Sequence, residues 1–140
     1  MDAFDADVLI FAAAPDHPFG PRVRALLEPG PVERSGPISG IGSVLLLTEL
    51  LAKPLRDGAD EEVAALAAVL GRVELLPLDR ATALLATSLA AAYRLRAADA
   101  AHLATAVAAG ADRFITNNSS DFTRSITEIA VTYPADLPDP

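Results

Sequence analysis

Apolar residues recur at helical spacing in the second half of the chain. Val63, Leu66 and Leu70 follow Asp60 at intervals of three and four residues, and Gly71 ends the run. This pattern predicts a helix with Asp60 as its N-cap residue. The same features predict two further helices, over 80–93 after the N-cap residue Asp79 and over 97–109 before Gly110.

Short runs rich in β-branched and aromatic residues lie beside these helices. They predict strands at 73–76, 113–116 and 129–131. Because strands that alternate with helices are typical of a parallel sheet covered by helices, the sequence predicts an α/β fold. Residues 8–11 form a continuous apolar run that fits either a strand or a turn of buried helix. Most glycines and prolines fall in 15–42, where turns are expected.

The composition is that of one folded domain. The chain has 140 residues, of which 51% are hydrophobic, and its mean hydropathy is +0.33. That apolar content is enough to offset the chain entropy lost on folding. We expect a single domain over 1–132, followed by a solvated tail over 133–140 that contains three prolines and two aspartates.

Charge and residue types exclude several functions. The net charge of −8 opposes general attraction to a polyanion, so a nucleic acid can bind only where local groups overcome this repulsion. The absence of cysteine excludes disulfides, thiolate catalysis and cysteine-ligated metals. No apolar run is long enough for a bilayer span and the first residues are not basic, so we expect a cytoplasmic protein with no membrane partner.

Four carboxylates stand beside hydrophobic segments: Asp5, Glu49, Asp99 and Asp121. Asp5 follows a candidate first strand at 3–4, and Asp121 lies in the loop after the strand at 113–116. Ligands of parallel sheets bind beyond these strand ends. Two carboxylates ~5 Å apart repel by about 3 kcal/mol at an effective dielectric constant of 20, so such a cluster needs a hard cation. Oxygen ligands of this kind suit Mg²⁺ or Mn²⁺.

Each carboxylate alone also fits a structural role. Glu49 precedes Lys53 by four residues, the favourable order for an ion pair on a helix surface. Asp99 would stabilise a helix N-terminus through the helix dipole. Asp5 fits an exposed strand end, and Asp121 fits a turn cap.

Three basic residues near Asp99 are also open to two interpretations. His102 follows it by three residues, and a packed or hydrogen-bonded histidine is favoured over a general base because a metal ion activates water without one. Arg94 and Arg96 are candidates to contact substrate phosphates. Alternatively, they bind the carbonyl groups that end the preceding helix.

Four ordered segments resemble the motifs of PIN-domain ribonucleases, and the spacing around 110–112 is similar to that of VapC-type toxins. The segments are residues 5–10 (DADVLI), 46–51 (LLTELL), 95–106 (LRAADAAHLATA) and 115–122 (ITNNSSDF). The resemblance implies a three-layer α/β/α domain with a mainly parallel sheet of short strands, in which residues 8–14 are helical. It also implies a Mg²⁺- or Mn²⁺-dependent enzyme that cuts single-stranded or structured RNA.

The resemblance assigns residue roles and partners. It gives Asp5, Glu49, Asp99 and Asp121 the catalytic and metal-binding roles, and it places Thr116 and Asn117 in a supporting turn. It further implies a toxin that forms a homodimer and is inhibited by a cognate antitoxin whose tail covers the acidic site. Two neighbours of Asp5 depart from the family pattern: Ala6 replaces the common threonine, and Asp7, a possible fifth carboxylate, replaces asparagine or serine.

Other functions remain open from the residues alone. Asp5 and Asp7 also fit the Asp-x-Asp opening of haloacid-dehalogenase-type phosphatases, which need a lysine to balance the phosphate. The only lysine, Lys53, lies in the segment of Glu49, and this ranks the phosphatase lower. A receiver-like acidic pocket is also ranked lower, because such a pocket needs a lysine after a late strand and the sequence has none there. A PIN-like domain that only binds a partner is a third possibility, and the residue Ala6 is the kind of change it would show.

Overall fold

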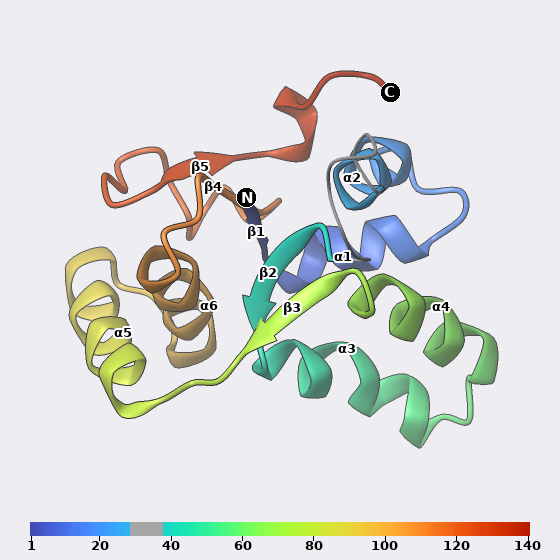
Figure 1. Ribbon diagram of the computed structural model, residues 1–140, viewed down its shortest axis with the longest axis horizontal. Helices are drawn as coiled ribbons and strands as arrows, with labels where there is room; N and C mark the ends of the chain where they lie inside the picture. Colours follow the sequence, from blue (N-terminus) through green and yellow to red (C-terminus); the bar gives the residue numbers. More distant parts are fainter. Residues whose placement is uncertain (29–37) are drawn as a thin grey trace.

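The computed structural model describes residues 1–28 and 38–140. Its elements alternate between strands and helices along most of the described chain (Figure 1). They are β1 (Asp2–Phe4), α1 (Ala6–Ala13), α2 (Gly20–Leu27), β2 (Gly40–Ser43), α3 (Leu45–Arg56), α4 (Asp60–Leu70), β3 (Val73–Leu76), α5 (Arg80–Tyr93), α6 (Ala97–Ala108), β4 (Arg113–Ile115), β5 (Ala130–Thr132) and the 3₁₀ turn η1 (Pro134–Asp136). No helix in this part of the chain is long and apolar enough to cross a bilayer.

The sheet has the strand order β3-β2-β1-β4-β5, and every pairing is parallel. The first strand is central: Ala3 pairs with Ile41 of β2 on one side and with Phe114 of β4 on the other. Helices α1 to α4 lie on one side of the sheet, and α5 and α6 lie on the other (Figure 1). The predicted α/β/α fold with three layers is therefore confirmed.

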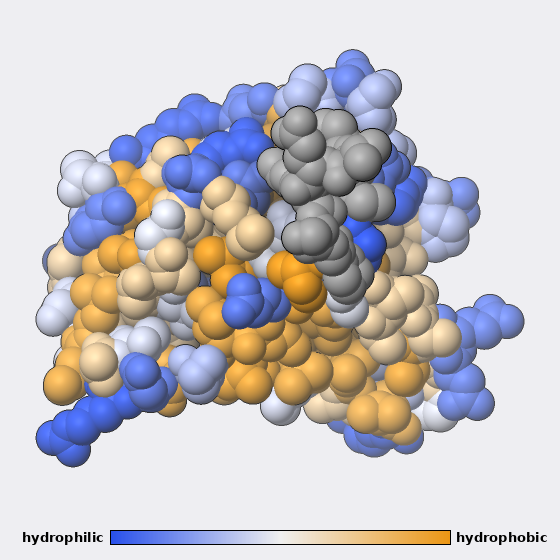
Figure 2. All heavy atoms as spheres, in the orientation of Figure 1, coloured by the Kyte–Doolittle hydropathy of each residue, from blue (hydrophilic) through white to orange (hydrophobic). Residues whose placement is uncertain are grey.

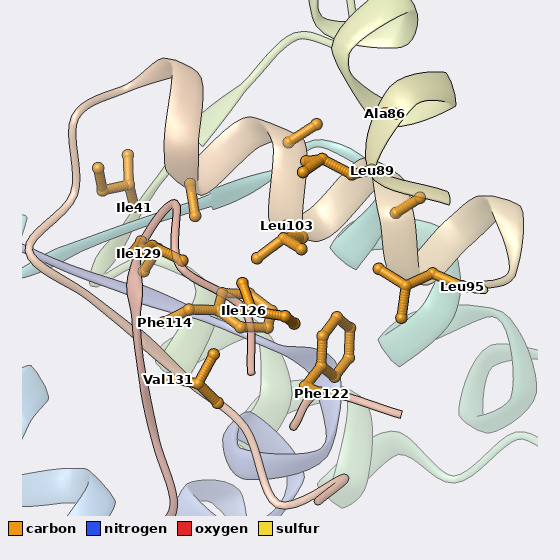
Figure 3. Close-up of a cluster of buried hydrophobic side chains, with 14 residues drawn as sticks. Ile41, Ala86, Leu89, Leu95, Leu103, Phe114, Phe122, Ile126, Ile129 and Val131 are labelled. Atoms are coloured by element: carbon orange, nitrogen blue, oxygen red, sulfur yellow. The ribbon is translucent and has the colours of Figure 1, made fainter. Parts of the chain in front are cut away.

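Two apolar cores hold these layers together. Between the sheet and the pair α5 and α6, Leu89 and Leu103 pack towards Phe114, Phe122 and their neighbours (Figure 3). The rings of Phe114 and Phe122 meet edge to face, with their centroids 5.0 Å apart. On the other face, the core is built from α1 to α4 and the strands they cover, with Phe4, Val8, Leu9, Leu46 and Ile115 almost completely buried.

Most predicted elements are confirmed, with small shifts at their ends. Strand β3 covers 73–76 as expected, and helix α5 starts after Asp79, whose side chain accepts a hydrogen bond from the Thr82 amide at 2.8 Å. The prediction that Asp60 caps α4 is wrong: Ala59 holds that position, and Asp60 is the first helical residue. An acidic residue also stabilises that first turn through the helix dipole.

The ambiguous run at 8–11 is helical. It belongs to α1, which starts after the N-cap residue Asp5. Val8 and Leu9 face the core while Ile10 is exposed, and a helix that faces solvent on one side produces this distribution. An apolar run alone does not distinguish this helix from a strand.

The turns expected over 15–42 give way in part to helix α2. Pro21 lies in its first turn, where the missing amide hydrogen costs nothing, and Val23 and Leu27 are buried. Pro21 is therefore compatible with the start of a helix and does not indicate a turn here. Residues 29–37 of the expected turn region lie outside the described residues.

The prediction of a solvated tail over 133–140 is wrong. Leu137 is only 3% exposed and belongs to the core on the side of α1 to α4. Arg22 of α2 donates hydrogen bonds to the carbonyl groups of Pro134 and Ala135, and it forms an ion pair with Asp139 at 2.8 Å. The prolines thus belong to an ordered segment that delivers one large apolar side chain to the core.

We expect the substitution Leu137→Ala to lower the free energy of unfolding by about 2–5 kcal/mol, because it leaves a cavity in the core. Urea unfolding followed by circular dichroism measures the change. The control is Leu84→Ala on α5, whose side chain is 59% exposed and whose loss should change stability by less than about 0.5 kcal/mol. Equal effects of the two substitutions would contradict a packed C-terminal segment.

Candidate active site

The candidate site lies where the strand order reverses. Strands β2 and β3 follow on one side of β1, whereas β4 lies on its other side, so the chain ends of β1 and β4 diverge into separate loops at this point. Such a switch point is where parallel α/β sheets bind their ligands. Asp5 directly follows β1, and residues 116–121 directly follow β4. The amide of Asp5 continues the ladder by donating to the carbonyl of Ile115 at 2.9 Å.

Asp5 is buried and held in one orientation. Only 6% of the residue is exposed, and its Oδ1 accepts a hydrogen bond from the Ala6 amide at 2.9 Å. Its Oδ2 accepts a hydrogen bond from the Thr116 hydroxyl at 2.7 Å. Burial raises the pKa of Asp5 above its usual value, and the hydrogen bond from Thr116 and the proximity of His102 act in the opposite direction.

A chain of hydrogen bonds runs from Asp5 to Asp121 through residues of the loop after β4. Thr116 Oγ1, which donates to Asp5, accepts from the Asn118 amide at 3.1 Å. Asn118 Nδ2 donates to Asp121 Oδ2 at 2.9 Å, and Asn118 Oδ1 accepts from the Asp121 amide at 3.2 Å. Asn118 thereby orients Asp121.

Asn118 is not among the site residues predicted from the sequence. A signal for its role is present, because asparagine side chains accept hydrogen bonds from amides a few residues further along and so shape turns. An aspartate three residues after Asn118 lies within reach of such a turn. Asn117, the residue expected to support the site, contributes its backbone amide, which donates to Asp7 Oδ2 at 3.1 Å.

Asp7 brings a fifth carboxylate to the edge of the site. Its Oδ1 is buried and has no hydrogen-bond partner among the residues that the structure describes. Burial, together with repulsion from Asp5, raises the pKa of Asp7 to about 7. The departure from the family pattern at this position therefore has an electrostatic cost.

Glu49 reaches the site from α3 and lies against a buried histidine. Its Oε2 is 3.1 Å from Nε2 of His102, a residue of α6 that is only 2% exposed. When the imidazole is protonated, this contact is an ion pair. The alternative of a surface pair with Lys53 is not observed among the described residues, and His102 is packed inside the domain as expected.

Asp99 projects from the first turn of α6 into the same region. Burial raises the pKa of Asp99, and repulsion from Asp5, Asp121 and Glu49 raises it further. The charges of Asp5, Asp121 and Glu49 act on Asp99, so the four carboxylates lie near one another although they are distant in the sequence. They come from the N-cap position of α1, from α3, from α6 and from the loop after β4.

The donor atoms of this site suit a hard divalent cation. They are carboxylate oxygens, the ligands that Mg²⁺ and Mn²⁺ take in proteins. In residues 1–28 and 38–140, no three histidine, aspartate or glutamate side chains surround one point closely enough to enclose a metal ion. The carboxylates would need to turn inwards to do so, and the charge of a cation would offset the repulsion that this movement creates.

The two arginines singled out from the sequence lie at the junction of α5 and α6. Arg94 is the C-cap residue of α5, with φ 56° and ψ 43°, and Arg96 is the N-cap residue of α6. Both are exposed, and neither guanidinium group forms a hydrogen bond or ion pair within the described chain. The alternative in which they bind the carbonyl groups of the preceding helix is therefore not observed.

Comparison with known proteins identifies the family of this domain. The family model of the PIN domain matches residues 4–125, which is most of the chain. The chain therefore belongs to the PIN domain family. A comparison with curated protein sequences found no match.

Solved structures of similar fold include a toxin–antitoxin complex from Klebsiella pneumoniae, with a TM-score of 0.70 and 21% identity over 96% of this chain and 98% of the other. VapBC2 from Rickettsia felis, bound to a promoter DNA fragment, gives a TM-score of 0.70 and 16% identity over 94% and 97%. FitAB bound to a DNA fragment gives a TM-score of 0.64 and 20% identity over 99% of this chain and 98% of the other. At these identities the likeness establishes the fold.

We expect Asp7→Asn to stabilise the metal-free protein above pH 7. The folded carboxyl group has a pKa of about 7 against an ordinary 3.8, so the native state binds more protons between these values and stability falls as pH rises. The substitution removes that charge and keeps an acceptor for the Asn117 amide. Urea unfolding in EDTA should show a gain of roughly 1–3 kcal/mol at pH 8 and almost none at pH 4. A gain that is the same at both pH values would contradict the electrostatic explanation.

Proposed function

We propose that this PIN domain is a ribonuclease that hydrolyses RNA phosphodiester bonds with Mg²⁺ or Mn²⁺ bound by Asp5, Glu49, Asp99 and Asp121. The observation that supports the proposal is the proximity of these four carboxylates at the switch point of the sheet, where burial raises the pKa of Asp99 and the charges of the other three raise it further. Repulsion of this kind is tolerated where a cation joins the carboxylates. Clusters of carboxylates with perturbed pKa values are typical of functional sites.

The bound cation would polarise the phosphoryl oxygen, lower the pKa of a water molecule and stabilise the leaving oxygen. The chain's own residues orient the carboxylates for this work. Thr116 and the Ala6 amide each donate one hydrogen bond to Asp5, to Oδ2 and Oδ1 respectively, and Asn118 holds Asp121. His102 keeps Glu49 on the side of α6, where Asp99 lies. Supporting contacts of this kind determine the affinity of metal sites.

Two alternative functions are weaker. The haloacid-dehalogenase-type phosphatase has no support in the family comparison, which identifies a PIN domain. A PIN domain that only binds a partner would keep the fold but lose cation binding at the carboxylates. The proximity of Asp99 to three further carboxylates favours the enzyme, because charges of one sign gathered at a strand end have no structural use in a silent domain.

We further propose that the protein is the toxin of a toxin–antitoxin pair and acts in the cytoplasm, with a cognate antitoxin as its inhibitor. The similar structures from Klebsiella pneumoniae and Rickettsia felis are toxin–antitoxin and VapBC2 complexes, and this supports the proposal. Both likenesses extend over nearly the full length of each chain. A small ribonuclease of this kind would need an inhibitor to keep the host's RNA intact.

A homodimer is the proposed oligomeric state. Apolar side chains gather over the part of the surface where β2 and β3 end and where α3 begins (Figure 2). Val44, Leu47 and Leu78 are each more than a third exposed near these strand ends. Exposed apolar patches on soluble domains mark surfaces that bind another protein.

We expect Asp99→Asn to abolish RNA cleavage and the growth arrest caused by induced expression without an antitoxin. The substitution removes one charge from the cation site and keeps the size of the side chain. Growth curves and mapping of RNA 5′ ends in a bacterial host measure both effects. The control is Asp16→Asn, a neutralised carboxylate outside the cluster, which should arrest growth like the wild type.

If neither the wild type nor Asp99→Asn arrests growth while soluble protein accumulates, the toxin proposal fails in that host. Titration of the purified protein with Mn²⁺ then distinguishes the remaining functions. Binding that requires Asp5 and Asp99 supports a nuclease with a narrow range of targets. Absence of such binding contradicts the enzyme and favours the silent domain.

We expect Thr116→Val to weaken Mn²⁺ binding about tenfold or more, because Asp5 loses the hydrogen bond that orients it. Isothermal titration calorimetry measures the Kd. The matched control is Thr105→Val, a buried threonine whose hydroxyl donates to the Ala101 carbonyl within α6 and does not contact the carboxylates. Equal Kd values for the two variants and the wild type would contradict this role of Thr116.

A further inference from the structure

A polar pocket of about 380 Å³ adjoins the carboxylate cluster. Its lining residues come from the junction of α5 and α6 and from the segment that joins β4 to β5. Its lining includes Tyr93, Arg94, Ser120, Asp121, Thr123 and Ser125. Because Asp121 belongs to both the pocket and the proposed cation site, a molecule in the pocket would lie next to the reacting groups.

The backbone of Arg94 is unusual for an arginine. Its φ of 56° lies in the left-handed region, which disfavours side chains with a Cβ and which helices normally fill with glycine at their C-terminal end. The other residues with positive φ in the described chain are glycines, Gly58 and Gly110. A long charged side chain thus occupies a position where the backbone conformation favours glycine, which has no side chain. Strain of this kind is common at functional sites.

The charge of Arg94 is also not used by the fold. Six arginines of the described chain form ion pairs or bind backbone carbonyl groups, namely Arg22, Arg24, Arg56, Arg72, Arg113 and Arg124, whereas Arg80, Arg94 and Arg96 do neither. Arg94 has neither kind of partner in the same part of the molecule, although the protein has a net charge of −8. An unpaired guanidinium group beside a carboxylate cluster suits a phosphate, which it binds through two parallel hydrogen bonds.

The rest of the lining suits a ribose. Ser120, Thr123 and Ser125 contribute hydroxyl groups, which both donate and accept hydrogen bonds. The 2′-hydroxyl of RNA needs partners of this type, and it is the group by which proteins distinguish RNA from DNA. Tyr93 is half-buried, and its hydroxyl is bound to Glu128, so its ring stays in place as one wall.

We propose that this pocket is the subsite for the nucleotide adjacent to the scissile bond of a single-stranded RNA. Arg94 binds a backbone phosphate of that nucleotide, and the hydroxyl groups of the pocket contact its ribose. The assignment rests on the proposed ribonuclease function. It provides the local positive charge that an acidic protein needs in order to bind a polyanion.

The test uses Arg94→Gly in the full-length protein. Glycine suits the left-handed backbone, so the melting temperature should equal or exceed that of the wild type while the guanidinium group is lost. Fluorescence anisotropy with a ten-nucleotide, mixed-sequence, single-stranded RNA in Ca²⁺, with the RNA checked for integrity, measures the Kd. We expect the Kd to rise about five- to tenfold and the slope of log Kd against log salt to fall by about 0.7.

Two controls separate the subsite from general electrostatics. Arg80→Gln removes an exposed charge at the start of α5 and should leave the Kd within about twofold of the wild type. DNA of the same sequence should bind more weakly to the wild type because it lacks the 2′-hydroxyl, whereas Arg94→Gly should weaken both nucleic acids because they share the phosphate. Equal losses for Arg80→Gln and Arg94→Gly, or equal affinities of the wild type for RNA and DNA, would overturn the assignment.

Failure of the subsite and failure of the ribonuclease function give different results. If the wild type binds RNA and Arg94→Gly binds it equally well, the subsite is wrong and the ribonuclease proposal stands. If the wild type does not bind RNA, both proposals are overturned. A stable Arg94→Gly protein with weakened RNA binding supports the subsite.

Discussion

Repulsion between carboxylates is the constraint around which this domain is arranged. Asp5, Glu49, Asp99 and Asp121 come from four different parts of the chain; burial raises the pKa of Asp99, and the charges of the other three raise it further. The fold keeps them in place by contacts outside the cluster: Thr116 binds Asp5, Asn118 binds Asp121, and His102 lies against Glu49. The two apolar cores hold the elements that bear these residues. In the proposed function, a divalent cation would offset this repulsion.

Much of the fold followed from local patterns. Helix α5 and strand β3 have clear periods and clear ends, and Asp79 marks the start of the helix by its own hydrogen bond. Where the pattern was ambiguous, as at 8–11, the preceding Asp5 acted as the N-cap that made the run helical. The four acids were found by their positions at the ends of elements, and the resemblance to PIN domains then grouped them.

What escaped prediction depends on contacts between distant residues. Leu137 stands among prolines and aspartates, and only the core it enters shows that it is buried. The contact of Glu49 with His102 joins α3 to α6, and no spacing within either helix reveals it. The left-handed backbone of Arg94 likewise could not be predicted, because glycine is the usual signal for that conformation and the sequence has arginine there. Local patterns describe elements, whereas tertiary contacts complete the site.

The central place of β1 has a consequence for the order of assembly. Asp5 and its partner Thr116 are separated by 111 positions, and β1 pairs with β4 over a similar interval. Contacts so distant in the chain are slow to form, because a long loop must close first. During synthesis on the ribosome, β1 can pair with β2 but not with β4 until β4 has emerged. A partly synthesised chain therefore lacks an assembled cluster, and the carboxylate site is complete only after β4 and the loop that follows it have joined the sheet.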